Sequence, residues 1–148
     1  MLKRVIAGCL LVLLAACGGD KTVDPKSTAE PVVRASCPMA ASEAVVLTEA
    51  ESGGTFAVGK GQGVVVSLAA NGSTGYSWSY RAAPEGVLVE NKSEYIADRP
   101  VMPGSGGRQC VRFIAAQEGT ARLAFEYRRP WETGVAPSET AQFDVTVR

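Results

Sequence analysis

Apolar and polar residues alternate with a period of two over most of the chain after Pro38, and Gly or Pro interrupts the alternation at short intervals. In one stretch Tyr76, Trp78 and Tyr80 share a face, because successive side chains of a strand point to opposite sides. No segment carries an apolar stripe with helical spacing. The pattern predicts eight strands, at residues 44–48, 54–58, 63–69, 76–81, 87–91, 109–115, 120–127 and 140–148.

Eight short strands within about 110 residues are typical of two antiparallel sheets packed face to face. We therefore expect an all-β, immunoglobulin-like antiparallel sandwich of seven or eight strands at residues 37–148. Loops separated by an even number of strands emerge at the same end of such a sandwich. Two strands separate the loop at 71–75 from that at 104–107, and two more lead to 129–131. All three loops are predicted to lie at one end.

The third of these loops places a large aromatic side chain in a polar turn. Pro130 fixes the backbone directly before Trp131, and Arg129 precedes both residues. A Trp positioned in this way indicates a recognition surface rather than a chemical centre. The alternative is a buried Trp that covers the end of the core, but Trp78 already has the position expected of the core Trp.

The other two loops consist mainly of residues that favour turns. The first reads Asn71-Gly72-Ser73-Thr74-Gly75-Tyr76, and the second reads Gly104-Ser105-Gly106-Gly107. Taken alone, either sequence is compatible with an ordinary turn or a flexible connector, because Gly and Asn adopt positive φ readily. The functional interpretation of the second loop is that glycines let the backbone approach another surface and exchange hydrogen bonds with it.

Together and in this order, the three loops resemble the chagasin family, protein inhibitors of papain-like cysteine peptidases. That family carries an Asn-Pro-Thr-Thr-Gly-aromatic loop, a Gly-x-Gly-Gly loop and an Arg-Pro-Trp loop at matching spacing. The resemblance runs from about residue 54 to residue 148, and between the first two loops it includes Val89-Glu90-Asn91-Lys92 and Tyr95. Any one motif would be weak evidence, but three in order on a matching strand pattern are specific.

The resemblance implies a role for each loop. The first loop enters the catalytic cleft of the peptidase with Thr74 near that enzyme's catalytic Cys and His, and Gly72 stands where the family has Pro. The second loop lies along the substrate-binding groove, and Arg129 and Trp131 contact the peptidase beside its active site. The implied function is reversible, tight-binding inhibition by occlusion of the cleft. The implied contact set is the first loop, the second loop and residues 129–131.

The composition argues against an enzyme. The chain has no histidine, which is the usual general base for a Ser or Cys nucleophile and the commonest metal ligand. No paired carboxylates suggest acid–base chemistry, so we expect no catalytic residue, metal or cofactor. The formal net charge of +0 without a Lys/Arg run gives no support for a nucleic-acid partner. The alternatives left open are an adhesion or envelope-assembly module and a carbohydrate-binding sandwich in which Trp131 and Tyr95 stack on sugars.

The first residues are typical of an export signal, with a basic start at 3–4 and an apolar run at 5–14 that is too short to span a bilayer comfortably. Residues 14–17, Leu-Ala-Ala-Cys, read as a bacterial lipobox. We therefore expect a lipoprotein signal peptide at residues 1–16 and lipidation of Cys17. The alternative is an ordinary signal peptide with a chance cysteine.

The polar residues 17–36 contain Pro and mixed charges without periodicity, which predicts a flexible tether between the lipid and the domain. The expected location is the bacterial cell envelope, with a membrane contact through the N-terminal lipid. Because Gly18 rather than Asp follows Cys17, the resemblance to sorted lipoproteins favours the outer membrane, facing the periplasm or the cell surface.

Two of the four cysteines remain for the folded part, since Cys9 lies in the signal and Cys17 is the lipidation site. In an oxidising compartment Cys37 and Cys110 are predicted to form a disulfide, and two unpaired thiols are the alternative. Because Cys110 closely follows Gly107, the bridge would also order the second loop before binding. We expect the domain to act as a monomer.

Overall fold

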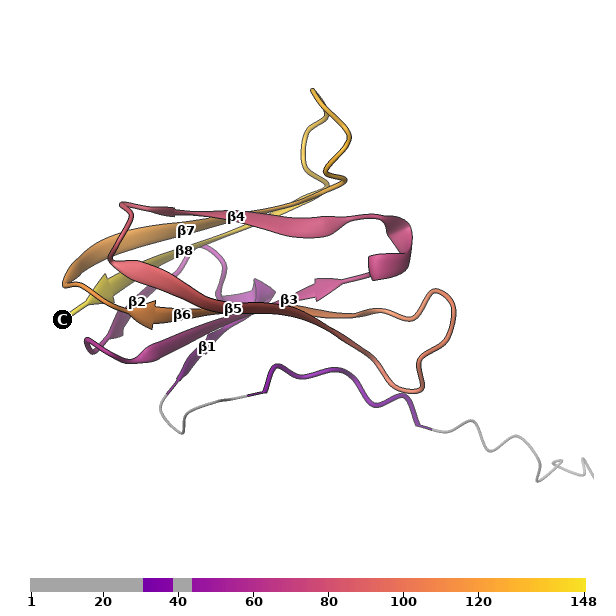
Figure 1. Ribbon diagram of the computed structural model, residues 1–148, viewed down its shortest axis with the longest axis horizontal. Helices are drawn as coiled ribbons and strands as arrows, with labels where there is room; N and C mark the ends of the chain where they lie inside the picture. Colours follow the sequence, from indigo (N-terminus) through magenta and orange to yellow (C-terminus); the bar gives the residue numbers. More distant parts are fainter. Residues whose placement is uncertain (1–30, 39–43) are drawn as a thin grey trace, which may run out of the picture.

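The computed structural model describes residues 31–38 and 44–148, which form a two-layered β-sandwich (Figure 1). One sheet has the strand order β1-β3-β6-β5, from β1 (Val45–Leu47), β3 (Gly63–Ala70), β6 (Gly107–Ala115) and β5 (Leu88–Ala97). The other has the order β2-β8-β7-β4, from β2 (Thr55–Val58), β8 (Glu139–Val147), β7 (Gly119–Arg128) and β4 (Ser77–Ala83). Two short 3-10 turns, η1 (Glu49–Glu51) and η2 (Gly72–Thr74), complete the described secondary structure.

All eight strands predicted from the alternation are present, and the all-β sandwich is confirmed. The largest difference is β5, which continues to Ala97 although the pattern predicted its end at Asn91. β5 forms one edge of its sheet and is mostly exposed, so polar residues occupy both of its faces and hide the alternation. A register shift between Glu90 and Lys92 interrupts the period further.

The two sheets are mixed rather than antiparallel throughout, which corrects the sequence-based expectation. β1 pairs in parallel with β3, and β2 pairs in parallel with β8. The reason is that the chain reverses direction at each strand, so two odd-numbered or two even-numbered neighbours must run the same way. Every antiparallel pair in the structure joins an odd-numbered to an even-numbered strand.

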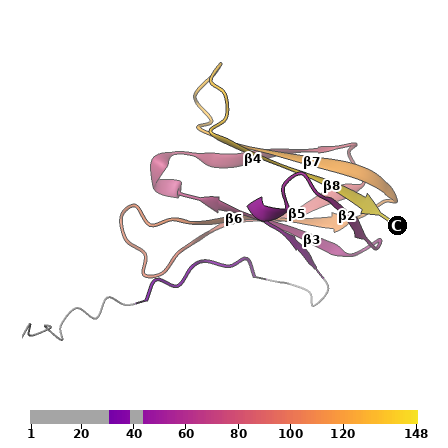
Figure 2. The same ribbon diagram turned by 180° about the vertical axis from the view of Figure 1, so that it is seen from behind.

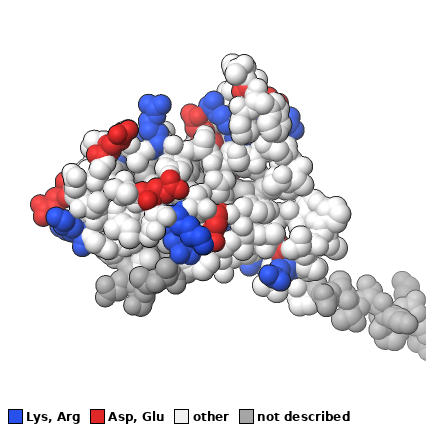
Figure 3. Space-filling model, viewed as in Figure 1, with Lys and Arg blue, Asp and Glu red and all other residues white. Residues whose placement is uncertain are grey.

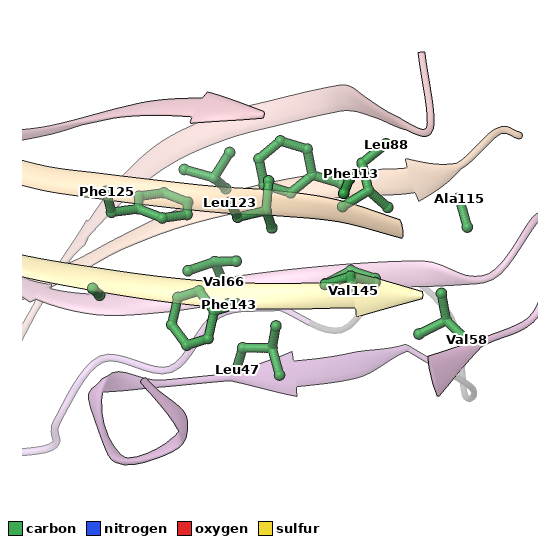
Figure 4. Close-up of a cluster of buried hydrophobic side chains, with 14 of the residues drawn as sticks. Leu47, Val58, Val66, Leu88, Phe113, Ala115, Leu123, Phe125, Phe143 and Val145 are labelled. Atoms are coloured by element: carbon green, nitrogen blue, oxygen red, sulfur yellow. The ribbon is translucent and has the colours of Figure 1, made fainter. Parts of the chain in front are cut away.

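The core lies between the sheets and is built from the alternating residues of both (Figure 4). Phe113 of β6 faces Tyr80 of β4 edge-on, and Phe125 of β7 packs against Phe143 of β8. Trp78 is 4% exposed and donates its indole N–H to the carbonyl oxygen of Ala69 at 2.8 Å. The prediction that Trp78 is the core Trp is therefore confirmed.

The disulfide between Cys37 and Cys110 is present, as predicted, and joins the N-terminal segment to the middle of β6. Residues 31–36, which the sequence assigned to the tether, lie beside the sandwich, where Val33 pairs with Arg99 as an isolated β-bridge. The expected signal peptide, Cys17 and residues 17–30 of the expected tether lie outside the described residues. Within the described part of the chain, no helix is long and apolar enough to cross a membrane.

Candidate functional site

Three loops gather at the end of the sandwich that lies opposite the C-terminus, and we call this surface the tip (Figures 1 and 2). The first loop is residues 71–76 between β3 and β4, the second is 98–106 between β5 and β6, and the third is 129–138 between β7 and β8. The first loop crosses from one sheet to the other, whereas the second and third each stay within one sheet. The first loop therefore lies between the other two, and the predicted convergence is confirmed.

Asn71 gives the first loop its shape. Its side-chain oxygen accepts hydrogen bonds from the Ser73 backbone N–H at 3.1 Å and the Ser73 hydroxyl at 2.7 Å, which caps η2. The Thr74 backbone N–H and hydroxyl both donate to the Asn71 carbonyl oxygen, at 3.2 and 2.7 Å. The exposed side chains of Ser73 and Thr74 are thus held on a turn whose polar groups are largely satisfied from within.

The same residue fastens the first loop to its surroundings. The Asn71 backbone N–H donates to the hydroxyl oxygen of Tyr127 at 2.9 Å, which ties the loop to β7 in the other sheet. The Asn71 side-chain amide donates to the carbonyl oxygen of Gly104 at 3.2 Å, which ties it to the second loop. One asparagine therefore connects the first loop to both of the sheets that it joins.

The second loop is closed at its base and shaped by Ser105. The Asp98 backbone N–H donates to the Gly106 carbonyl oxygen at 2.9 Å, and the Ser105 hydroxyl accepts a hydrogen bond from the Met102 N–H at 2.8 Å. Gly104 has a φ of +84°, a conformation that other residues rarely adopt. Of the four predicted residues, Gly104 is exposed, Ser105 and Gly106 are partly exposed, and Gly107 is buried as the first residue of β6.

Gly107 supports the tip from below rather than forming part of its surface. A Cβ atom at this position would lie 2.3 Å from the carbonyl oxygen of Ile96 and 2.6 Å from the hydroxyl oxygen of Tyr95. Only a residue without a side chain therefore lets Tyr95 lie across the start of β6. The Tyr95 ring in turn lies beside Gly72 of the first loop.

Arg129 joins the third loop to the first. Its Nε donates to the carbonyl oxygen of Thr74 at 3.2 Å, and its guanidinium lies 4.7 Å from the ring centroid of Tyr76. Its Nη1 lies 3.1 Å from the Glu132 carboxylate within the same loop. The sequence predicted Arg129 as a peptidase contact, and the structure shows that much of this half-buried side chain is occupied with loop–loop contacts.

Trp131 lies on the surface and leans on the first loop. It is 66% exposed, so it does not cover the core, and its ring packs over Gly75. A Cβ atom at Gly75 would lie 2.4 Å from Cη2 of Trp131, and Gly75 has a φ of +77°. Gly75 is therefore required twice, once for the turn and once for the position of the indole.

Several exposed apolar residues of the tip were not predicted as site residues from the sequence. They are Val101 and Met102 in the second loop and Val135 in the third. The available signal was an apolar residue within a Gly- and Pro-rich segment, where no strand alternation could bury it. The end of the molecule that carries η2 and the second loop is largely free of charged side chains (Figure 3).

The β1–β2 connection supports the same end of the sandwich. Arg108 donates to the Ser67 hydroxyl oxygen at 2.6 Å and forms an ion pair with Glu49 at 2.8 Å. Burial raises the pKa of the Glu49 carboxyl. The hydrogen bonds from the Ala69 N–H and from Arg108 together lower the pKa by more than burial raises it, so the net pKa lies below the ordinary value. Glu49 is thus held as an anion that fixes η1 against the ends of β3 and β6.

The tip has the properties of a binding surface rather than a reaction centre. Among the described residues, no group of three or more His, Cys, Asp or Glu side chains could hold a metal ion. What the tip offers is exposed backbone and apolar side chains on three mutually bonded loops. The fold and the site therefore define a β-sandwich protein whose one end is suited to recognising another macromolecule.

The particular family follows from comparison with known proteins. Residues 57–147 match the family model described as the Chagasin family peptidase inhibitor I42, and the chain belongs to this family. This match includes all three loops of the tip. The family consists of inhibitors, which agrees with the expectation that the chain is not an enzyme.

Individual relatives agree with this assignment. The chain is 36% identical over 87 residues to Amoebiasin-1 of Entamoeba histolytica, a match that covers 57% of this chain and 82% of the relative. It is 26% identical over 89 residues to Chagasin of Trypanosoma cruzi, with coverages of 57% and 81%. A crystal structure of a cysteine protease inhibitor from Entamoeba histolytica is similar with a TM-score of 0.65 at 26% identity, covering 71% of this chain and 96% of that chain. The solution structure of Amebosin has a TM-score of 0.57 at 32% identity, with coverages of 70% and 97%.

Two substitutions of Asn71 separate its role in capping η2 from its hydrogen bond to the second loop. Asn71→Ala removes the cap of η2 and the link to Gly104, and should lower the free energy of unfolding by about 1–2 kcal/mol in urea titrations. Asn71→Asp keeps an oxygen that can cap η2 but loses the amide donor to Gly104. It should therefore retain most of the stability while amide hydrogen exchange in the second loop becomes faster. Equal exchange in wild type and Asn71→Asp would show that this hydrogen bond does not order the second loop.

Proposed function

We propose that the protein is a reversible, tight-binding inhibitor of papain-like cysteine peptidases that blocks the active-site cleft with its tip. Membership of a peptidase-inhibitor family supports inhibition, and the similar structure of a cysteine protease inhibitor supports the class of target. The observation that carries the proposal is the linkage of three exposed loops into one surface through Asn71 and Arg129.

The central position of the first loop suits it to enter the cleft. Its turn is held by Asn71 from within and by Tyr127 from below, so the exposed Thr74 is presented in a defined orientation. The second loop, on one side, offers backbone groups near Gly104 and Gly106 that can pair with an extended peptide-binding groove. Trp131, on the other side, offers apolar area beside the cleft.

Tight binding follows from the order that the loops have before they meet the peptidase. Fixing a flexible glycine-rich loop on binding costs conformational entropy, roughly 1–2 kcal/mol per backbone residue. The internal hydrogen bonds of the tip remove part of this cost in advance. An interface of about 800 Å² per partner is then sufficient for nanomolar affinity without a covalent step.

The proposal includes a place in the cell. A lipid-anchored monomer in the bacterial cell envelope, in the outer membrane facing the periplasm or the cell surface, is supported by the basic start, the apolar run and the Leu-Ala-Ala-Cys sequence that ends at Cys17. An inhibitor at this location would meet peptidases that reach the envelope.

The inhibition itself is tested by titrating papain with the chain, and Trp131→Ala tests its anchor. Wild type should abolish peptidase activity near stoichiometric concentration. Because Trp131 is exposed and offers a large apolar ring to the partner, Trp131→Ala should weaken inhibition about 30- to 1,000-fold, with a nearly unchanged melting temperature. Trp131→Phe should retain most of the affinity. Undiminished papain activity at micromolar wild-type protein would refute the function, and a large fall in melting temperature for Trp131→Ala would show that the ring is structural.

Gly72→Pro should improve the inhibitor. Gly72 is the first residue of η2, a position that favours Pro, and Asn71 before it is extended with φ −135° and ψ 98°. Space is available, since a Cβ atom there would be 3.8 Å from the nearest atom, in the Tyr95 ring. The restricted unfolded chain should raise the free energy of unfolding by about 0.4–1 kcal/mol and tighten inhibition by about twofold to fivefold. Gly72→Ala is the control and should give a smaller gain, whereas weaker inhibition by Gly72→Pro would mean that the loop must move to bind.

Cys17→Ala tests the anchor. In the bacterium the wild-type chain should incorporate labelled palmitate and fractionate with the membranes, and Cys17→Ala should do neither, because the acceptor thiol is gone. Cys9→Ala, which changes a cysteine of the expected signal peptide, is the matched control and should stay labelled. Labelling that persists in Cys17→Ala would place the lipid elsewhere or exclude the lipobox interpretation.

A further inference from the structure

The most exposed apolar side chains of the described protein include two that no loop of the tip contains. Six large apolar side chains are more than half exposed, and the next, Val89, is 48% exposed. They are Val32, Val33, Val101, Met102, Trp131 and Val135. Four belong to the second and third loops, and the remaining two belong to residues 31–38, which we call the arm. The arm precedes residues 57–147, the part that matches the family model.

The arm is fastened along its length to the sheet that carries the second loop. Val33 and Arg99 exchange two backbone hydrogen bonds, at 2.8 and 3.0 Å. The Ala35 N–H donates to the Asp98 carboxylate at 2.6 Å, and Cys37 is bonded covalently to Cys110 of β6. Exposed valines on a segment held in this way have a defined position, as a preformed contact surface requires.

Asp98 makes the arm and the second loop one structural unit. Its side chain binds the arm at Ala35, while its backbone N–H donates to Gly106 and closes the loop. The disulfide therefore reaches the second loop through the arm and Asp98, rather than by clamping the glycines directly. The arm runs below the sheet that contains β3 and β6, with its N-terminal end beneath the second loop (Figures 1 and 2).

The arm also adds shape and charge to this side of the tip. A surface hollow of about 290 Å³ lies between Val32 and Ala35 of the arm and the ends of β3 and β6, next to Gly106. The exposed guanidinium of Arg34 has no hydrogen bond or ion pair with any described residue. A partner that covers this region would need an apolar surface with neutral or acidic surroundings.

We propose that the arm is a fourth peptidase-binding segment, which extends the three-loop surface through Val32 and Val33 and is held in register by the Cys37–Cys110 bridge. The inference rests on the proposed function and assigns to it residues outside the part matched by the family model. The occupant is the same peptidase, because a groove that receives the second loop also approaches the segment paired with that loop at Arg99.

A double substitution, Val32→Ser with Val33→Ser, tests the contact. It leaves the two backbone hydrogen bonds and the disulfide in place, so the melting temperature should stay unchanged. The inhibition constant of the full-length chain against papain should rise about tenfold, mostly through faster dissociation. Val89→Ser is the matched control, because Val89 is an exposed valine at the far end of β5, where the strand pairs with Ile114. This control should inhibit like wild type.

A second pair of variants tests the attachment. Cys37→Ser with Cys110→Ser removes the covalent attachment and leaves the arm its hydrogen bonds, among them those to Asp98 and Arg99. It should weaken inhibition severalfold and speed amide exchange in residues 98–106. Adding the valine changes to this variant should have a smaller effect than in the bridged chain, because a loosened arm contributes less to binding.

The outcomes distinguish a failure of the arm proposal from a failure of the proposed function. Inhibition by the double valine variant that equals wild type would overturn the arm proposal while leaving the three-loop function intact. Equal inhibition together with lost binding to phospholipid vesicles would assign the surface to a membrane, and equal inhibition together with a lost dimer in light scattering would assign it to a second copy of the chain. A wild-type chain that inhibits no papain-like peptidase would overturn both proposals.

Discussion

The hydrogen bonds of Asn71 tie the first loop to β7 in one sheet and to the second loop of the other sheet, and no strand pairing among the described residues joins these two sheets. The first loop passes from one sheet to the other, so its ends belong to different layers of the sandwich. Asn71 bonds to Tyr127 in one layer and to Gly104 in the other, while its side-chain oxygen completes η2. Arg129 then adds the third loop by bonding to Thr74. These contacts join three loops into one surface, and each loop is also shaped by hydrogen bonds of its own.

The sequence predicted the fold well because burial imposes alternation on most strands. Where a strand is buried on one side, as with Phe125 and Phe143, the polar and apolar residues can be read directly. The pattern fails for β5, an edge strand with polar residues on both faces. It also carries no information on which strands become neighbours, so the parallel pairs at the edges of the two sheets were not foreseen. The reversal of the chain at every strand did predict that the three loops share one end.

The location of the candidate site could be predicted from the sequence. Which of its residues face the surface and which hold the loops together could not. A Trp after a Pro in a turn indicated an exposed ring, and Trp131 is exposed. The sequence could not show that the Arg129 side chain contacts Thr74, Tyr76 and Glu132. The first two of these contacts join residues more than fifty positions apart. For the same reason the sequence could not show that Gly75 makes room for Trp131. Nor could it show that Gly107 lies under Tyr95, because that contact depends on how β5 pairs with β6. The disulfide was predicted, but the hydrogen bond from Ala35 to Asp98, through which the disulfide-bonded arm is joined to the second loop, was not.

The closure of the second loop at its base bears on the fate of an inhibitor that lies in an active groove. Asp98 and Gly106 are joined by a hydrogen bond, and β5 and β6 continue as a paired hairpin from Ala97 and Gly107 onward. A peptidase that hydrolysed a bond near Met102 would therefore release neither fragment, since both new termini would stay anchored in the same sheet. The nicked chain would keep its shape and remain bound, and the severed bond could be rejoined. With the second loop in the groove as proposed, this architecture would make the protein a poor substrate even where its backbone is accessible.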